Sequence, residues 1–73
     1  MSGMLTLSEF DALVVRIAEQ CCYNATHIEL YNGSLFVQGC TPANASRMQT
    51  KFADNGIGVI VTPGDVEYAF DFV

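Results

Sequence analysis

The chain has 73 residues, about half of them apolar, and its eight acidic and three basic side chains give a net charge of -5. This length provides one small core, so residues 1-73 are expected to form a single domain. The apolar content excludes an intrinsically disordered chain. Three basic residues are too few to follow a phosphate backbone, so direct nucleic-acid binding is disfavoured, whereas a basic protein partner suits the negative charge.

Targeting features point to a cytoplasmic protein. The N-terminal stretch MSGMLTLSEF lacks the basic residues and the long apolar core of a signal peptide. No apolar run approaches the roughly 20 residues that cross a membrane. Three cysteines leave one unpaired under any disulfide scheme, which favours a reducing compartment. We therefore expect a cytoplasmic chain without membrane contact.

The first helix is predicted to begin after Thr6. The sequence Thr6-Leu7-Ser8-Glu9 matches a capping box, and Leu5 is placed to pack against Phe10. Apolar side chains then recur at helical spacing. They are Leu7, Phe10, Leu13, Val14, Ile17, Ala18 and Cys21, flanked by Val15 and Cys22. The helix is expected to end near Tyr23-Asn24.

The segment from His27 to Gly39 is predicted to be a β-hairpin. Its Asn32-Gly33 pair favours a two-residue type I′ turn, which needs positive φ at both central residues. This turn pairs Tyr31 with Ser34 and sets the register of both strands. One face is then apolar, with Ile28, Leu30, Leu35 and Val37, while the other carries His27, Glu29, Tyr31, Ser34, Phe36 and Gln38.

Thr41-Pro42 predicts the start of a second helix, with Thr41 as the N-cap and Pro42 at the first helical position. The inner edge of this helix is expected to carry Ala45, Met48 and Phe52. The pair Asn55-Gly56 then provides a left-handed cap at its C-terminal end.

A second hairpin is predicted over residues 57-73, turning at Thr62-Pro63-Gly64-Asp65. Val61 is expected to face Val66 whether the loop has two or four residues. One strand face then carries Val59, Val61, Val66, Tyr68, Phe70 and Phe72, and the other carries Ile60, Thr62, Glu67, Ala69 and Asp71.

Two helix-hairpin units in succession, αββαββ, predict an α+β fold. Each element has one apolar face, which favours a four-stranded antiparallel sheet with both helices on one face. A right-handed crossover through the second helix predicts strand order 1-2-4-3. This topology is a circular permutation of the ferredoxin-like split βαβ fold, an analogy of element order that assigns no function.

The sheet face away from the helices is the predicted partner-binding surface. Its candidate contact residues mix aromatic, apolar and charged side chains, as interface cores do. They are Tyr31, Phe36, His27, Glu29, Ile60 and Glu67. The alternative is that these are the scattered apolar side chains of an ordinary surface. RNA-recognition domains stack bases on such a face, but the carboxylates here repel phosphates, so a protein or a second copy is preferred.

The strand from Gly58 to Thr62 is predicted to lie at an edge of the sheet. It is apolar and lacks the charged side chains that protect natural edges. We therefore expect a partner, or another copy of the chain, to cover it. A homodimer would also stabilise so small a domain.

Cysteine and histidine provide the candidates for catalysis. Cys40 precedes the predicted helix start, where the helix dipole lowers a thiol pKa, and strand parity puts it on the same sheet side as His27. No third residue is evident to orient the imidazole, so catalysis is not the preferred interpretation. Of the adjacent pair Cys21 and Cys22, only Cys21 is expected to point into the core. No C-x-x-C spacing supports a metal site, and no cofactor is expected.

The preferred function is a small acidic protein-binding module that forms a homodimer, and no catalytic activity is inferred from the residues. Two alternatives stay open. One is a thiol-dependent enzyme or redox sensor centred on Cys40. The other is a viral or phage-type accessory protein that acts on a basic host partner, which rests on the size and acidity of the chain.

Overall fold

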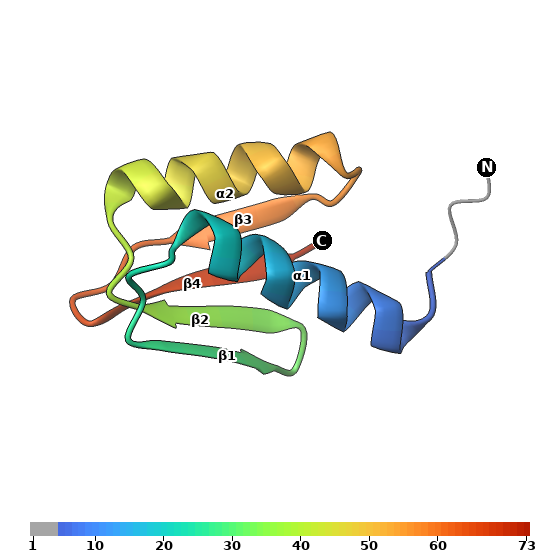
Figure 1. The fold of residues 1–73 in the computed structure, drawn as a ribbon, viewed down its shortest axis with the longest axis horizontal. Coiled ribbons are helices and arrows are strands. Elements are labelled where there is room, and N and C mark those ends of the chain that lie inside the picture. Colours follow the sequence, from blue (N-terminus) through green and yellow to red (C-terminus); the bar gives the residue numbers. More distant parts are fainter. Residues whose placement is uncertain (1–4) are drawn as a thin grey trace.

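The computed structural model describes residues 5–73, so part of the N-terminal stretch considered for a signal peptide lies outside it. Two helices and four strands follow one another in the predicted αββαββ order (Figure 1). They are α1 (Leu7–Cys21), β1 (His27–Tyr31), β2 (Ser34–Gln38), α2 (Pro42–Asp54), β3 (Val59–Thr62) and β4 (Glu67–Phe72). The α+β class is confirmed.

The predicted capping box starts α1. The Glu9 backbone N–H donates to Thr6 Oγ1 at 3.1 Å, and the Thr6 N–H donates to the Glu9 carboxylate at 2.8 Å. These bonds satisfy two N–H groups that a helix start leaves without partners. Leu7, expected on the apolar side, is instead 77% exposed. The reason is that the first turn of α1 extends past the end of the first hairpin in Figure 1.

The C-terminal end of α1 also differs from the prediction. The helix ends at Cys21 rather than near Tyr23-Asn24, and Cys22, with φ -121° and ψ 58°, has left the helical conformation. The Cys22 side chain therefore no longer points where helical spacing would place it, and it is buried together with Cys21. The expectation that only Cys21 points into the core is therefore wrong.

The first hairpin has the predicted register. Asn32 has φ 52° and Gly33 has φ 77°, as a type I′ turn requires. Tyr31 lies opposite Ser34, and the same register continues without a shift to His27 opposite Gln38. The apolar faces of β1 and β2 therefore point together toward the helices.

Both predicted caps of α2 are present. The Asn44 N–H donates to the hydroxyl of the N-cap residue Thr41 at 3.1 Å. At the other end Gly56 has φ 75°, and the N–H of Ile57 donates to the carbonyl of Phe52 at 2.8 Å. This bond closes a Schellman-type cap. The inner edge of α2 is buried as predicted, at Ala45, Met48 and Phe52.

The sheet is antiparallel with strand order β1-β2-β4-β3, as predicted. The second hairpin, however, pairs Val61 with Phe70 and not with Val66, so its register differs from the prediction by four residues. Val66 lies in the loop and is 73% exposed. The error is an even number of residues, so the strand residues keep their predicted faces.

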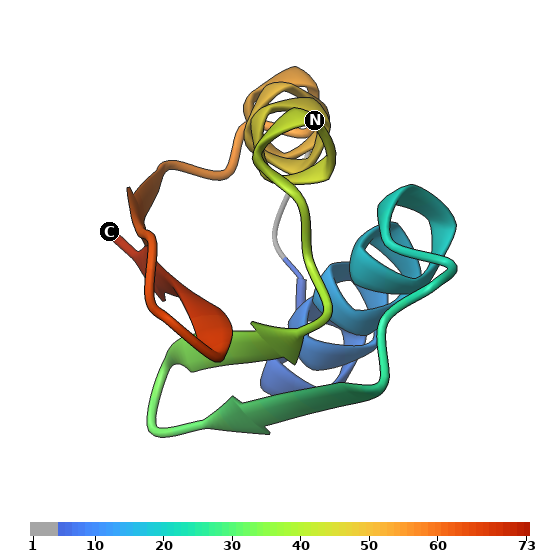
Figure 2. The ribbon, with the colours of Figure 1, turned by 90° about the vertical axis from the view of Figure 1, so that its left-hand side faces the viewer.

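Both helices cover one side of the sheet, as Figure 2 shows. The core lies between these two layers, and its largest fully buried side chains come from every element except β1 and β3. Phe72 joins the layers through edge-to-face contacts, with ring centroids 5.5 Å from Phe10 of α1 and 5.4 Å from Phe52 of α2. The opposite side of the sheet has no covering element within residues 5–73.

Candidate interaction surface

The uncovered side of the sheet carries all six predicted partner-binding residues, and the pairing arranges them in three rows across the strands. The first row is Tyr31, Ser34, Asp71 and Ile60; the second is Glu29, Phe36, Ala69 and Thr62; the third is His27, Gln38 and Glu67. These rows define what we call the open face. It carries three carboxylates, from Glu29, Glu67 and Asp71, and no lysine or arginine.

Polar contacts divide the open face. His27 Nε2 lies 3.3 Å from Glu29 Oε1 along β1, and the Ser34 hydroxyl donates to the Asp71 carboxylate between β2 and β4. Tyr31 and Ile60 share a row but lie on opposite edge strands, separated by that polar pair. Tyr31 and Ile60 therefore do not adjoin each other along this row.

Backbone pairing determines which groups of β3 face its free edge. The Val73 N–H donates to the Gly58 carbonyl at 3.1 Å, so Gly58 directs its backbone groups toward β4. In a paired strand, successive residues direct these groups to opposite edges. Ile60 therefore also faces β4, whereas Val59 and Val61 direct their N–H and C=O groups outward. Among residues 5–73, no loop or cap bonds to these outward groups.

The other edge strand, β1, offers similar backbone groups with different side chains. The two-residue turn makes Tyr31 and Ser34 the hydrogen-bonded closing pair, so Glu29 faces β2 while Ile28 and Leu30 face outward. Between those two residues the open face carries the Glu29 carboxylate, and the equivalent position of β3 carries Ile60. The edge at β1 is thus protected by charge, and the edge at β3 is not.

The structure does not bring the predicted Cys40–His27 pair together. His27 contacts Glu29 on the open face, while Cys40 packs against the core and its Sγ lies 3.4 Å from the Sγ of Cys22. The cause is Gly39, whose φ of 84° turns the chain after β2 and ends the strand alternation. The predicted placement of Cys40 on the side of His27 is therefore wrong.

Burial changes the acidity of both paired thiols. It raises the pKa of Cys22 to about 12, and the nearby Cys40 thiol adds to this rise. Burial also raises the pKa of Cys40, although its hydrogen bond with Cys22 acts in the opposite direction. The lowered thiol pKa expected at the start of α2 is not found. A raised pKa leaves little thiolate at neutral pH, so the arrangement does not supply an activated nucleophile.

Cys22 is the residue that sequence reasoning missed. Its buried Sγ lies 3.6 Å from Met48 Sδ as well as close to Cys40. A helix continuing to Tyr23 would have turned this side chain toward the flank of α1. Two turn-forming residues could have indicated this arrangement, Asn24 after the first helix and Gly39 before Cys40. Neither residue specifies where the helix ends, so the burial of Cys22 could not be predicted from them.

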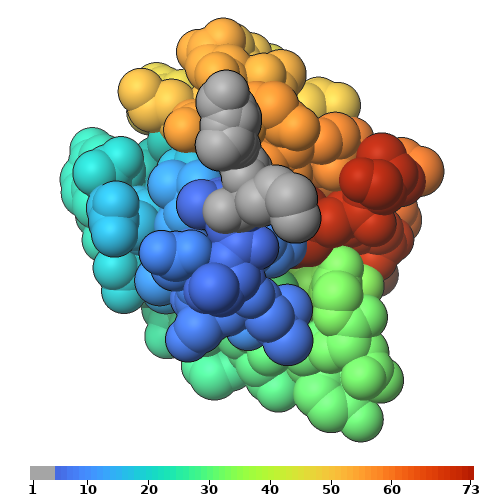
Figure 3. Space-filling model, turned by 90° about the vertical axis from the view of Figure 1, so that its right-hand side faces the viewer, coloured from blue at the N-terminus to red at the C-terminus, as the bar shows by residue number. Residues whose placement is uncertain are grey.

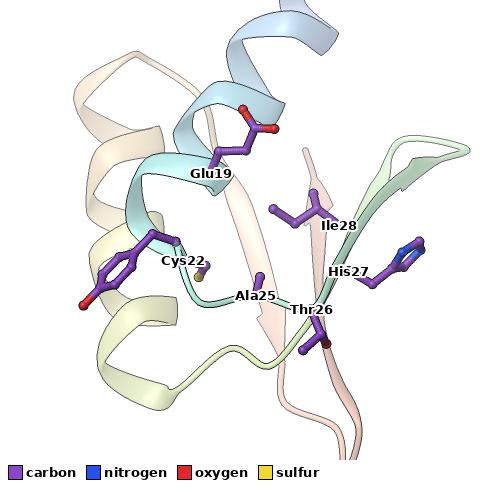
Figure 4. A pocket seen from close by; sticks show the side chains of 7 residues that line it. Glu19, Cys22, Ala25, Thr26, His27 and Ile28 are labelled. Carbon is purple, nitrogen blue, oxygen red and sulfur yellow. The ribbon is translucent and has the colours of Figure 1, made fainter.

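Residues 5–73 form several shallow hollows on the surface. One borders the end of α1 and the start of β1, and Figure 4 shows its side chains: Cys22 and Ala25 lie toward the helices, while the His27 imidazole points away. A second runs between the helices beside Arg47 and Lys51, and a third lies at the start of α1. Within residues 5–73 no group of three or more metal-binding side chains gathers.

Comparisons with known proteins found no matching family model, no similar curated protein and no similar solved structure. Neither helix in the described part of the chain has the length and apolar character needed to cross a bilayer.

Proposed function

We propose that this chain is a small protein-binding module that works as a cytoplasmic homodimer joined through the free edge of β3. The observation that carries the proposal is the uncharged strand Val59–Thr62 at the edge of the sheet, with outward backbone groups at Val59 and Val61. Unpaired strand edges of this kind recruit another strand, which satisfies their backbone groups.

A second copy fits this edge through a two-fold axis at Ile60. In antiparallel pairing around that axis, Val59 of each copy lies opposite Val61 of the other. Both pairs are hydrogen-bonded, which gives four new backbone bonds. The two Ile60 residues then form the close, non-bonded pair on the open face, with Cα atoms about 4.5 Å apart. Each Ile60 side chain is 57% exposed in the single chain, so the contact buries apolar surface.

The same two-fold pairing at β1 is unfavourable, and this contrast favours β3 as the dimer edge. A two-fold axis there would place the Glu29 carboxylates of the two copies directly opposite each other. Like charges in this position destabilise strand pairing. Pairing β1 of one copy with β3 of the next would not close and would produce a filament. The dimer at β3 forms a continuous eight-stranded sheet whose enlarged open face is the surface for a further protein partner.

Sedimentation equilibrium of two matched variants tests the dimer. Ile60→Lys places two ammonium groups opposite each other at the axis, while Asp71 beside it compensates the charge within each chain. Tyr31→Lys is the control, because Tyr31 occupies the other end of the same row and is 62% exposed. We expect Ile60→Lys to weaken dimerisation at least tenfold and Tyr31→Lys to leave it within twofold. A monomeric wild-type protein at micromolar concentration would refute the proposal.

A second candidate function is supported by the charge of the open face. Its three carboxylates, without lysine or arginine, suit a basic partner, which is the chemistry of a viral or phage-type accessory protein that blocks a host factor. The salt dependence of binding distinguishes the two functions. Screening strengthens association between two copies that each carry a charge of -5, whereas it weakens binding to a basic partner.

We also propose that the fold is a circularly permuted ferredoxin-like fold. Moving β4 to the front of the chain converts αββαββ into the split βαβ order while retaining the neighbours in β1-β2-β4-β3. The blue start of α1 and the red end of β4 lie together at one end of the molecule (Figure 3). A permutant that joins these ends with a short linker and opens within residues 63–66 should fold cooperatively. An unfolded permutant would contradict this assignment.

A further inference from the structure

Cys22 and Cys40 approach each other from two different segments. Cys22 follows α1, and Cys40 lies just before the Thr41 cap of α2, 18 residues further along the chain. Their Sγ atoms are 3.4 Å apart, and both are free thiols. The third cysteine, Cys21, is also free and buried, but it makes no sulfur contact of this kind among the described residues.

The backbone around both cysteines is held in place by hydrogen bonds and close packing. The Cys22 N–H donates to the Ala18 carbonyl at 2.8 Å, and the Cys22 carbonyl accepts from Ala25 at 2.9 Å. Beside Cys40, Gly39 approaches so closely that a Cβ there would lie 3.2 Å from the backbone nitrogen of Thr26. The fold thus fixes the backbone positions from which the two thiols approach each other.

We propose that Cys22 and Cys40 form a reversible intramolecular disulfide, with a low-molecular-weight disulfide such as oxidised glutathione as the oxidant. This modification site does not depend on the dimer. The two cysteines flank the first hairpin, β1 and β2, whereas the proposed dimer edge is β3 at the other end of the sheet.

The exposure of the two thiols sets the order of the steps. Cys40 is half-buried and meets the oxidant first, whereas Cys22 is 1% exposed. The Cys40 thiol loses its proton and attacks glutathione disulfide, forming a mixed disulfide and releasing one glutathione thiol. Cys22 then loses its proton and attacks the Cys40 sulfur, releasing the second glutathione. The two protein thiols are oxidised by two electrons in total, and one glutathione disulfide is reduced to two thiols.

The disulfide would join the end of α1 to the start of α2 and enclose the whole first hairpin. Closing a chain segment of this length restricts the unfolded state and raises stability. For a domain of this size, the midpoint of thermal unfolding should rise by about 10–20 °C. Because attack needs a thiolate and burial disfavours it, oxidation should proceed faster under mildly alkaline conditions than at neutral pH.

The test is oxidation of the full chain by oxidised glutathione, followed by intact mass measurement and cleavage after glutamate. Glu19 and Glu29 bound a peptide that contains both Cys21 and Cys22, while Cys40 lies in the following peptide. We expect the loss of two hydrogen atoms per chain and a cross-link between residues 20–29 and 30–67. A thiol reductant should reverse both changes.

Replacing each cysteine by alanine shows which two cysteines form the disulfide. The cross-link should form in Cys21→Ala and be lost in Cys40→Ala, whose half-buried site tolerates the change, and in Cys22→Ala. Three results would overturn the proposal: a cross-link that persists in Cys22→Ala, a glutathione adduct at Cys40 that never closes, or no reaction after prolonged alkaline incubation. Loss of the dimer in Ile60→Lys with normal oxidation would separate the two proposals.

Discussion

The two hairpins of this protein differ in what sets their register. In the first, Asn32 and Gly33 adopt the two positive φ values of a type I′ turn, and the turn alone aligns β1 with β2. In the second, a longer loop of residues 63–66 joins β3 to β4, and Val61 pairs with Phe70. There the register follows from the pairing of β4 with the central strand β2 and from burial of Phe70. The register set by a two-residue turn can therefore be predicted from sequence, while the register across a longer loop depends on tertiary packing.

The largest expected effect comes from removing the side chain that aligns the second hairpin. Phe70 is fully buried and lies between Leu35 and Val61 across the sheet. Phe70→Ala should lower the free energy of unfolding by about 3–5 kcal/mol, enough to unfold much of a small domain. Urea denaturation measures this loss. Leu30→Ala, half-buried in the first hairpin, is the matched variant, and a greater loss there than at Phe70 would contradict this account.

Lengthening each turn by one glycine compares directly how far each turn determines the register of its hairpin. An insertion between Asn32 and Gly33 destroys the type I′ turn and should cost about 1–2 kcal/mol of stability. The same insertion after Gly64 enlarges a loop that does not set the register, and should change stability by less than about 0.5 kcal/mol. Thermal unfolding of both variants compares them directly. Equal losses would show that the second turn also sets its register.

A separate expected effect is a pH dependence located beside the first hairpin. Folding raises the pKa of the Cys22 thiol from 9.0 to about 12. Its contribution to stability is therefore fully present below pH 9.0 and is lost as the pH rises toward 12, because the unfolded chain ionises first. Under reducing conditions, stability should fall across this range less steeply in Cys22→Ala than in the wild-type protein. Identical slopes would show that this thiol is not responsible.

Much of the fold could be predicted from local sequence signals. The Thr6 and Thr41 caps, the Asn32-Gly33 turn and the apolar spacing all act over a few residues, so their geometry follows from the residues themselves. The strand order required one rule of connection handedness beyond these signals. These local rules were sufficient because each element has a single apolar face.

The errors arose where one residue changes the direction of the chain. The first helix ends at Cys21, before the predicted end near Tyr23-Asn24, and Gly39 reverses the side on which Cys40 lies. Both changes depend on packing between segments that are distant in sequence. The candidate thiol site was therefore placed on the wrong side of the sheet, while the open face was placed correctly because strand alternation is preserved within β1 to β4.

Hydrogen exchange at the two edges tests the proposed dimer most directly. Val59 and Val61 direct their N–H groups outward from β3, as Ile28 and Leu30 do from β1, so all four amides should exchange quickly in the isolated chain. As protein concentration rises, we predict slower exchange at Val59 and Val61 alone. Fast exchange at Val59 and Val61 at concentrations where the protein is dimeric, or equal protection at β1, would contradict pairing through β3.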